Sequence, residues 1–262
     1  MKKARKFTPN LILLLVLTAI VLCSAVATYF DSIMVSKTVK LITVTILMTF
    51  YFCQLNKMAN VFLTTFLLFF IGDAFAVFSF GELMLKLSKS MYIGAYLLLI
   101  FVLLGKVKKI KFNGLVSVYL ILVLLLNSYF LYVLYEVAKE NFVDEVNLAL
   151  YVFHGISLIA LMYFSFAVYL SKETGQSITF LLMVFCLVFS DVLNYINTLY
   201  IYYWLFEVFE QTLHISGLFL LYKYVYDHHK MVNNEKKMNL SDYFIKTSQY
   251  LRDIKVEEVR KA

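Results

Sequence analysis

Long apolar runs recur along this chain, and they constrain its fold more than any other feature. A transmembrane helix needs about 20 predominantly apolar residues in succession. Eight runs approach or exceed this length, and they lie near residues 10–30, 37–55, 59–80, 90–105, 112–134, 146–170, 177–200 and 202–226. We therefore predict an all-α fold, a polytopic transmembrane helical bundle of about eight spans.

Composition agrees with a membrane protein. Of the 262 residues, 62% are hydrophobic and 16% are charged, whereas soluble domains are about one-half apolar and one-quarter charged. The first run follows a basic segment and could pass for a signal peptide. Its apolar stretch from Leu11 to Tyr29 is longer than a usual signal-peptide core, and no clear cleavage site follows. We expect an uncleaved first span.

The distribution of positive charge predicts the orientation of the bundle. With eight spans and a cytoplasmic N-terminus, all but five of the 24 Lys and Arg fall on the inner side. The five on the outer side are Lys37, Lys40, Lys86, Lys89 and Lys139. Because cytoplasmic loops of membrane proteins are enriched in Lys and Arg, this pattern favours eight helices with both termini in the cytoplasm.

The C-terminal segment differs in composition from the rest of the chain. Residues 1–227 form the predicted eight-helix transmembrane domain, and residues 228–262 form a charged cytoplasmic tail. Apolar residues recur in the tail with only a weak regular spacing. Two alternatives are therefore open, a short helix lying on anionic lipid or a solvated segment. The expected location is an integral, multi-pass position in a bacterial inner (plasma) membrane.

The charge pattern and the ligand-type residues exclude several functional classes. The net charge of +7 is spread in short blocks between apolar runs, which is typical of topology determinants, so we expect no nucleic-acid partner. The three cysteines all lie in apolar runs and are expected to behave as small hydrophobic residues. Glu210 and His214 have a spacing that could serve a metal, but no second histidine stands at ligand spacing. We expect neither a metal nor another cofactor.

Two aspartates lie at membrane depth and carry most of the functional argument. Asp73 and Asp191 each follow a small residue, and each lies 14 positions into its predicted span. At about 1.5 Å per residue, both carboxylates stand roughly 21 Å above the cytoplasmic face. Charged groups inside a span are costly and usually functional. We predict that the pair is catalytic, although a helix–helix hydrogen bond is the structural alternative for each aspartate taken alone.

Other polar residues are expected at the same level. The eighth predicted span presents Glu207, Glu210 and His214 on one helical face. The remaining members of the layer are Lys40, Asn127, His154 and Asn194, so that six spans contribute. His154 alone would more often be a packed histidine, and Glu207 could simply be interfacial. We predict Asn127, His154, Asn194 and Glu210 as substrate-binding residues.

Two carboxyl groups in such a layer can divide the work of acid and base. Two carboxylates close together in a poorly solvated site resist ionising at the same time, so that one stays protonated while the other is charged. This arrangement provides a general acid beside a general base. Neither a serine nucleophile elbow nor a zinc-binding HExxH motif competes with it in the sequence.

These residues resemble the YhhN family of integral membrane proteins, whose characterised members are lysoplasmalogenases. The resemblance rests on Gly72-Asp73, on Ser190-Asp191 and on the eight predicted helices, and it covers about residues 35–226. Further similarities are Lys37, Lys40, Gly94, Tyr151, Met162, Gln211 and Gly217. The chain departs from the family where Thr38 replaces the usual proline after Lys37, and where Val102 and Leu103 stand in place of a histidine.

The resemblance implies a hydrolase that cleaves the vinyl-ether bond of lysoplasmalogen-type lipids, with Asp73 and Asp191 as acid and base. The expected partners are a membrane lipid substrate and the bilayer itself, and the sequence gives no indication of oligomeric state. Lys37 and Lys40 are candidates to meet the lipid phosphate, and Gln211 is a further substrate-binding candidate. The alternative is a non-enzymatic carrier or sensor that uses the same carboxylates as a proton relay.

Overall fold

The computed structural model describes residues 9–30, 33–54, 58–78, 81–107, 114–141, 144–172 and 174–231. All regular structure in these ranges is helical. The elements are α1 (Pro9–Tyr29), α2 (Ile33–Gln54), α3 (Asn60–Val77), α4 (Glu82–Val107), α5 (Gly114–Asn141), α6 (Glu145–Lys172), α7 (Gly175–Leu199) and a C-terminal helix over residues 204–231. The predicted all-α class is confirmed for the described part of the chain.

Six of these helices are long and apolar enough to cross a membrane, and this identifies an integral membrane protein. They are α1, α3, α4, α5, α6 and α7. In α2 the described apolar part, Thr38–Gln54, is shorter. The predicted tail is described only in its first four residues, 228–231, which continue the C-terminal helix. The rest of the predicted tail lies outside the described residues.

The helices match the predicted runs closely, and the largest differences are at α4 and α5. The fourth run was predicted at 90–105 but α4 begins at Glu82, and the fifth was predicted at 112–134 but α5 continues to Asn141. Both extensions carry charged residues, such as Lys86 in α4 and Lys139 in α5. An apolar run ends where charge begins, whereas backbone hydrogen bonds of a helix continue into the membrane interface.

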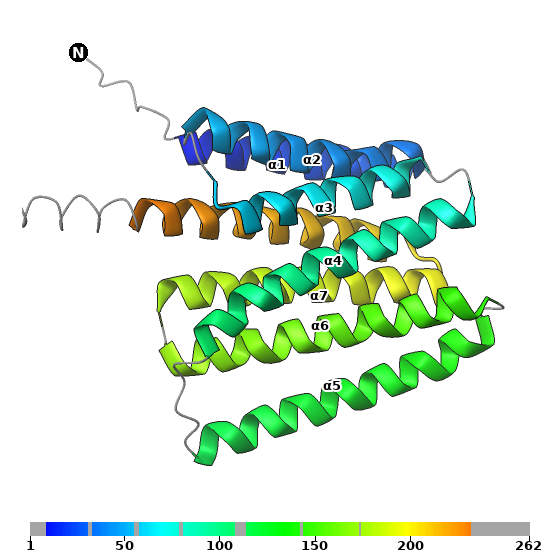
Figure 1. Cartoon of the computed structure of the whole chain (residues 1–262). Coiled ribbons are helices and arrows are strands. Elements are labelled where there is room, and N and C mark those ends of the chain that lie inside the picture. The colour runs from blue at the N-terminus through cyan, green and yellow to red at the C-terminus, as the bar shows by residue number, and fades with distance from the viewer. Residues whose placement is uncertain are drawn as a thin grey trace, which may run out of the picture.

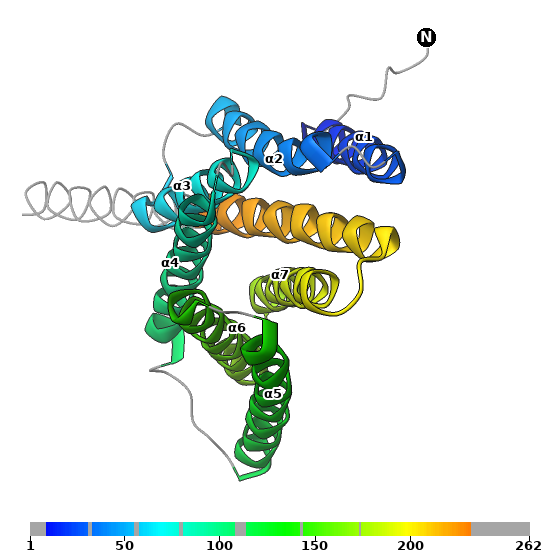
Figure 2. The ribbon, with the colours of Figure 1, turned by 90° about the vertical axis from the view of Figure 1, so that its right-hand side faces the viewer.

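Successive helices run up and down through one bundle (Figure 1). The start of α1 and residue 231 of the C-terminal helix therefore lie toward the same end, together with the ends of α2, α4 and α6. Among α1 to α7, the packing is most extensive between α3 and α4 and between α4 and α6, so α4 joins the first part of the bundle to the second. Figure 2 shows the C-terminal helix between α2 and α7.

Close approach of the C-terminal helix to α7 depends on a glycine. A Cβ atom added at Gly217 would lie 2.8 Å from Cδ2 of Leu187, which is too close for a carbon–carbon contact. The same helix places Tyr222 edge-to-face against Tyr51 of α2 and Tyr224 edge-to-face against Phe62 of α3. Buried side chains of the C-terminal helix thus pack against α2, α3 and α7.

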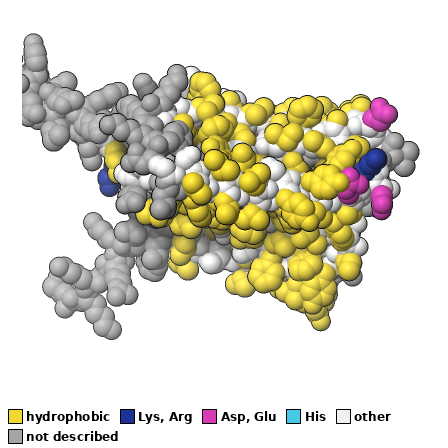
Figure 3. All heavy atoms as spheres, turned by 90° about the horizontal axis from the view of Figure 1, so that it is seen from below, with side chains coloured by type: hydrophobic (Ala, Val, Ile, Leu, Met, Phe, Trp, Pro, Cys, Tyr) yellow, Lys and Arg dark blue, Asp and Glu magenta, His cyan; other side chains and the backbone are white. Residues whose placement is uncertain are grey.

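The outer surface is apolar over most of its height (Figure 3). Helix α5 lies at the edge of the bundle (Figure 2) and exposes Leu122, Leu125, Leu126 and Tyr129. Charged side chains are visible at both ends of this view, beyond the apolar belt. An apolar belt flanked by charge is what a bilayer requires of a surface that it surrounds.

Candidate functional site

A polar cavity of about 460 Å³ lies inside the bundle, bounded by α2, α3, α4, α6, α7 and the C-terminal helix. Its lining includes groups that can carry or transfer a proton, namely Lys40, Asp73, Glu82, Lys89, Tyr92, His154, Asp191, Tyr195, Glu210 and His214. We call it the carboxylate cavity. Both aspartates stand in the second half of their helices, nearer Val77 of α3 and Leu199 of α7 than the starts of these helices.

Asp73 is almost completely buried, with 1% of its surface exposed. The Tyr92 hydroxyl of α4 donates a hydrogen bond to its Oδ1. The preceding carbonyl, of Gly72, accepts a hydrogen bond of 2.8 Å from Ser88 Oγ. A Cβ at Gly72 would lie 3.3 Å from the Tyr92 ring, so glycine at this position allows the ring to reach the carboxyl group. Asp73 Oδ2 has no hydrogen-bond partner among the described residues.

Asp191 is held in a similar way from the other side. The Tyr96 hydroxyl donates to Asp191 Oδ2 over 2.6 Å, and His154 Nε2 of α6 lies 3.5 Å from the same oxygen. His154 Nδ1 is hydrogen-bonded to the Tyr195 hydroxyl of α7. The residue before Asp191, Ser190, donates its hydroxyl to the backbone carbonyl of Glu210 over 2.9 Å.

The two aspartates are therefore oriented by one helix. Tyr92 and Tyr96 are four residues apart on α4, one helical turn, and each binds one carboxyl group. Because a helical turn rises about 5.4 Å, the two hydroxyl groups present the carboxyls to neighbouring positions of one cavity. A pair of carboxyl groups with separate hydrogen-bond donors can hold different protonation states.

An ion pair between α2 and the C-terminal helix completes the charged lining. Lys40 Nζ lies 2.5 Å from Glu210 Oε1, and both side chains are largely buried. Lys40 and Glu210 also lie within electrostatic range of both aspartates. The ammonium group partly offsets three acidic side chains that would otherwise repel one another in a poorly solvated space.

Three lining atoms are buried and have no hydrogen-bond partner in the described part of the chain, namely Asp73 Oδ2, His154 Nε2 and His214 Nε2. Buried polar atoms without a partner are costly, and they usually mark the position of water or a polar ligand. They face a cavity large enough for both. No group of three or more His, Cys, Asp or Glu in the described residues is placed to hold a metal ion.

Six of the predicted site residues meet at this cavity, namely Lys40, Asp73, His154, Asp191, Asn194 and Glu210. Gln211 is buried but bonds to Ser24 of α1 and does not line the cavity. Lys37 lies in α2, and its side chain is outside the described residues.

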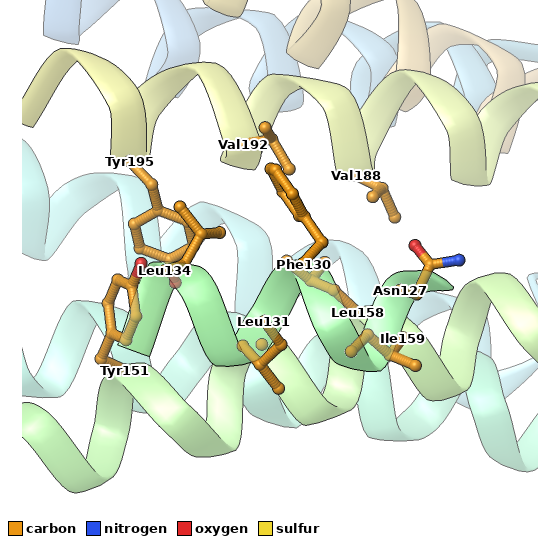
Figure 4. Close-up of a pocket in the computed structure, with 11 residues that line it drawn as sticks. Asn127, Phe130, Leu131, Leu134, Tyr151, Leu158, Ile159, Val188, Val192 and Tyr195 are labelled. Carbon is orange, nitrogen blue, oxygen red and sulfur yellow. The ribbon is translucent and has the colours of Figure 1, made fainter. Parts of the chain in front are cut away.

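Asn127 lies elsewhere. Its amide donates to the carbonyl of Val123 within α5 over 2.8 Å. It lines a separate apolar cleft of about 40 Å³ between α5, α6 and α7 (Figure 4). Six helices line the carboxylate cavity, as many as the sequence predicted for the polar layer. However, one of them is α4, whereas α5 was predicted.

The sequence argument missed the contribution of α4. Tyr92, Tyr96 and Tyr195 bind the aspartates and His154, yet they are three of 20 tyrosines in the chain. Their one available signal was the spacing of Tyr92 and Tyr96, because two hydroxyl groups on one face of an apolar helix need partners in a membrane.

The chain has no match among protein-family models, curated proteins or solved structures.

Proposed function

We propose that this protein is an integral-membrane hydrolase that cleaves the vinyl-ether bond of lysoplasmalogen-type lipids in the carboxylate cavity. The observation that carries the proposal is the placement of Asp73 and Asp191 on one cavity, each oriented by a tyrosine of α4. The resemblance of the sequence to the YhhN family supports the same reaction, and membership of that family is part of the proposal.

The reaction needs one acid and one base, and the cavity has a candidate for each. Asp73 in its protonated form transfers a proton to the vinyl carbon remote from the ether oxygen, which leaves an oxocarbenium ion. Its Oδ2 is the carboxyl oxygen without a partner among the described residues, and it therefore suits the role of donor. A neighbouring carboxylate stabilises the positive charge that develops.

Asp191 in its ionised form takes a proton from water as the water adds to the oxocarbenium carbon. The hemiacetal then collapses as Asp73 takes the proton of its hydroxyl group and Asp191 returns its proton to the leaving glycerol oxygen. This step releases a fatty aldehyde and a glycerophospho-alcohol, consumes one water for each bond cleaved and restores both carboxyl groups. His154, 3.5 Å from Asp191 Oδ2, is placed to orient this water together with the carboxylate.

The proposed topology has eight spans with both termini in the cytoplasm of a bacterial cell, and it places the carboxylate cavity in the outer half of the membrane. The distribution of Lys and Arg supports this orientation. Cysteine labelling of intact cells tests it. A cysteine introduced at Lys109 or Asn234 should resist a membrane-impermeant thiol reagent, and reaction from outside would refute the orientation.

The decisive experiment is an aldehyde-release assay on the full-length protein in detergent with lysoplasmalogen. Asp73→Asn and Asp191→Asn keep the size of each side chain and remove the transferable proton. Each should lower kcat by about two to four orders of magnitude, the range of general acid–base catalysis. Asp227→Asn, an acidic residue of the C-terminal helix outside the cavity lining, is the matched control and should keep full activity. Full activity in either cavity variant would refute the mechanism.

A carrier or sensor using the same groups is the second candidate. The observation that favours it is the Lys40–Glu210 ion pair in a cavity with two aspartates and two histidines, an array through which protons could pass. Proteoliposomes with an internal pH indicator separate the two functions. Proton uptake without aldehyde release, abolished by Asp191→Asn, would favour the carrier over the hydrolase.

A further inference from the structure

A second cavity, of about 220 Å³, lies at the other end of α4 and α6. Its lining comes from the last turns of α4 and α6, the first turns of α7 and the end of the C-terminal helix. These residues are Leu103, Lys106, Ser165, Val168, Lys172, Thr174, Gln176, Ser177, Phe180 and His228. We call it the basic cup. It has no part in the proposed hydrolysis, because none of its residues lines the carboxylate cavity.

The polar lining of the cup is positive or neutral. Lys106, Lys172 and His228 are its ionisable residues, and no Asp or Glu is among the described residues that line it. Lys106 is held in place by Tyr224, because its ammonium group donates to the tyrosine hydroxyl and lies 4.8 Å from the centre of the ring. Two lysines on one cavity repel one another, and an anion between them relieves this repulsion.

A buried hydroxyl group in the cup has no partner. Ser165 is 2% exposed and lines the cavity, and its Oγ has no hydrogen-bond partner in the described part of the chain. A buried hydroxyl left without a partner costs about 1–3 kcal/mol. This atom is independent of the lysines, and it indicates that a hydrogen-bonding ligand belongs in the cavity.

The start of α7 adds a favourable electric field. Thr174 caps this 25-residue helix through a capping box with Ser177, and both residues line the cup. The first turn of a long helix carries a partial positive charge and attracts anions. The lining also includes three buried apolar side chains, Leu103, Val168 and Phe180.

We propose that the basic cup binds a phosphate group, as a phosphate mono- or diester carried by a lipid headgroup or by a soluble metabolite. A phosphate has enough oxygens to accept hydrogen bonds from two ammonium groups and from Ser165 at the same time. The apolar lining residues suit the carbon atoms attached to the phosphate. In the proposed orientation the cup faces the cytoplasmic leaflet, where basic pockets between transmembrane helices meet anionic headgroups.

The test uses the full-length protein in neutral detergent with two phosphate sources. Phosphatidylglycerol represents a lipid headgroup and glycerol 3-phosphate a soluble ester, and diacylglycerol and glycerol are their phosphate-free counterparts. Lipid retention in native mass spectrometry and the shift in the thermal-unfolding midpoint report binding. The wild-type protein should bind at least one phosphate source and neither counterpart, and the arm that binds identifies the source. Binding of neither source would overturn the proposal.

Variants locate the binding in the cup. Lys106→Gln with Lys172→Gln should weaken binding by about ten-fold or more, because each lysine contributes a charge-assisted hydrogen bond. Lys223→Gln with Lys230→Gln is the matched control, since both lysines are exposed on the same half of the C-terminal helix and neither lines the cup. Equal weakening by the two pairs would assign binding to general surface charge and overturn the proposal.

A second variant, without any change of charge, tests the same site independently in case the double lysine variant does not fold. Ser165→Leu places an apolar side chain in the cup and removes the hydroxyl group. It should abolish binding of the phosphate source while the aldehyde-release activity and the elution volume of the protein stay unchanged. Undiminished binding in this variant would show that the phosphate lies elsewhere.

Discussion

The carboxylate cavity and the basic cup are built on the same helices but differ in charge. Helices α4, α6, α7 and the C-terminal helix line both cavities. The first gathers acidic groups from separate helices beside Lys40 and Lys89. The second combines two lysines and a histidine with a hydroxyl group that has no partner among the described residues. A long membrane helix can thus carry proton-transfer groups in one half and an anion-binding group in the other, with an apolar segment between them.

The largest expected effect tests whether these two regions act independently. Asp191→Asn should lower aldehyde release by about two to four orders of magnitude and leave phosphate binding unchanged. Lys106→Gln should weaken phosphate binding and leave the rate of aldehyde release near that of the wild type. Distant sites without shared partners behave additively, so the double variant should show both losses and nothing more. Loss of phosphate binding in Asp191→Asn would show that the regions are coupled.

The next prediction concerns the stability of the carboxylate cavity. Lys40→Gln removes the cation from a largely buried ion pair and leaves Glu210 beside two aspartates. Removal of one partner of such a pair typically costs about 3–5 kcal/mol. We expect a lower thermal-unfolding midpoint in detergent, and we expect Lys40→Met combined with Glu210→Leu to recover much of the loss.

Kinetics of the same variants test the earlier prediction that Lys40 meets the lipid phosphate. If it does, Lys40→Gln raises KM and nearly preserves kcat, because that contact is similar in the substrate and in the transition state. The contact with Glu210 at 2.5 Å indicates instead a role within the cavity. A change of KM alone in protein of unchanged stability would restore the phosphate assignment.

The sequence predicted how deep the site residues lie in the membrane, but it did not predict which way each helix is rotated about its axis. Counting residues along each span placed Asp73, Asp191 and His154 at one level, because the rise per residue of a helix is constant. The same count placed Asn127 there, yet α5 turns this residue toward its own backbone and an apolar cleft. The rotation of a helix about its axis is set by packing, and in a membrane both faces are apolar, so hydrophobicity does not reveal it.

The fold was more accessible to prediction than the site. Apolar runs located the helices because a bilayer imposes a minimum length and requires internal backbone hydrogen bonding. The first turns of α4 were not predicted, because they contain Lys86 and Lys89. In a sequence, charged residues at the end of a helix cannot be distinguished from charged residues in a loop. The tyrosines that hold the aspartates could not be singled out, since their role depends on contacts between α4 and other helices.

A smaller effect is expected from the tyrosines that orient the aspartates. Tyr96→Phe removes the hydroxyl that donates to Asp191, and Tyr92→Phe removes the donor to Asp73. Asp191 is the proposed carboxylate, and a hydrogen bond to a charged group contributes about 1.5–3 kcal/mol, so kcat of Tyr96→Phe should fall by about ten-fold or more. Asp73 is protonated in the proposed mechanism, and a hydrogen bond between neutral groups contributes about 0.5–1.5 kcal/mol, so the fall in Tyr92→Phe should be smaller. KM should change little, because neither hydroxyl is expected to bind the lipid chain. Tyr129→Phe on the exposed face of α5 is the control and should match the wild type.

The smallest effect is expected outside both cavities, at the ion pair that joins Lys86 of α4 to Asp144 before α6. The Lys86 ammonium group and the Val146 N–H lower the pKa of Asp144 from its ordinary value. A carboxyl group with a lowered pKa in the folded protein stabilises the fold above its unfolded-state pKa, and this contribution disappears as the pH falls below about 4.

Exposed ion pairs contribute little, because water and salt screen them and because two flexible side chains must be ordered. Lys86→Gln should therefore change the thermal-unfolding midpoint at pH 7 by no more than the error of the measurement. Asp144→Asn should behave in the same way. A large fall in the midpoint that high salt reproduces in the wild-type protein would show that this pair holds α4 against α6. The part of the carboxylate cavity that Glu82, Lys89 and Asn147 line from the same two helices would then depend on this ion pair as well as on its own contacts.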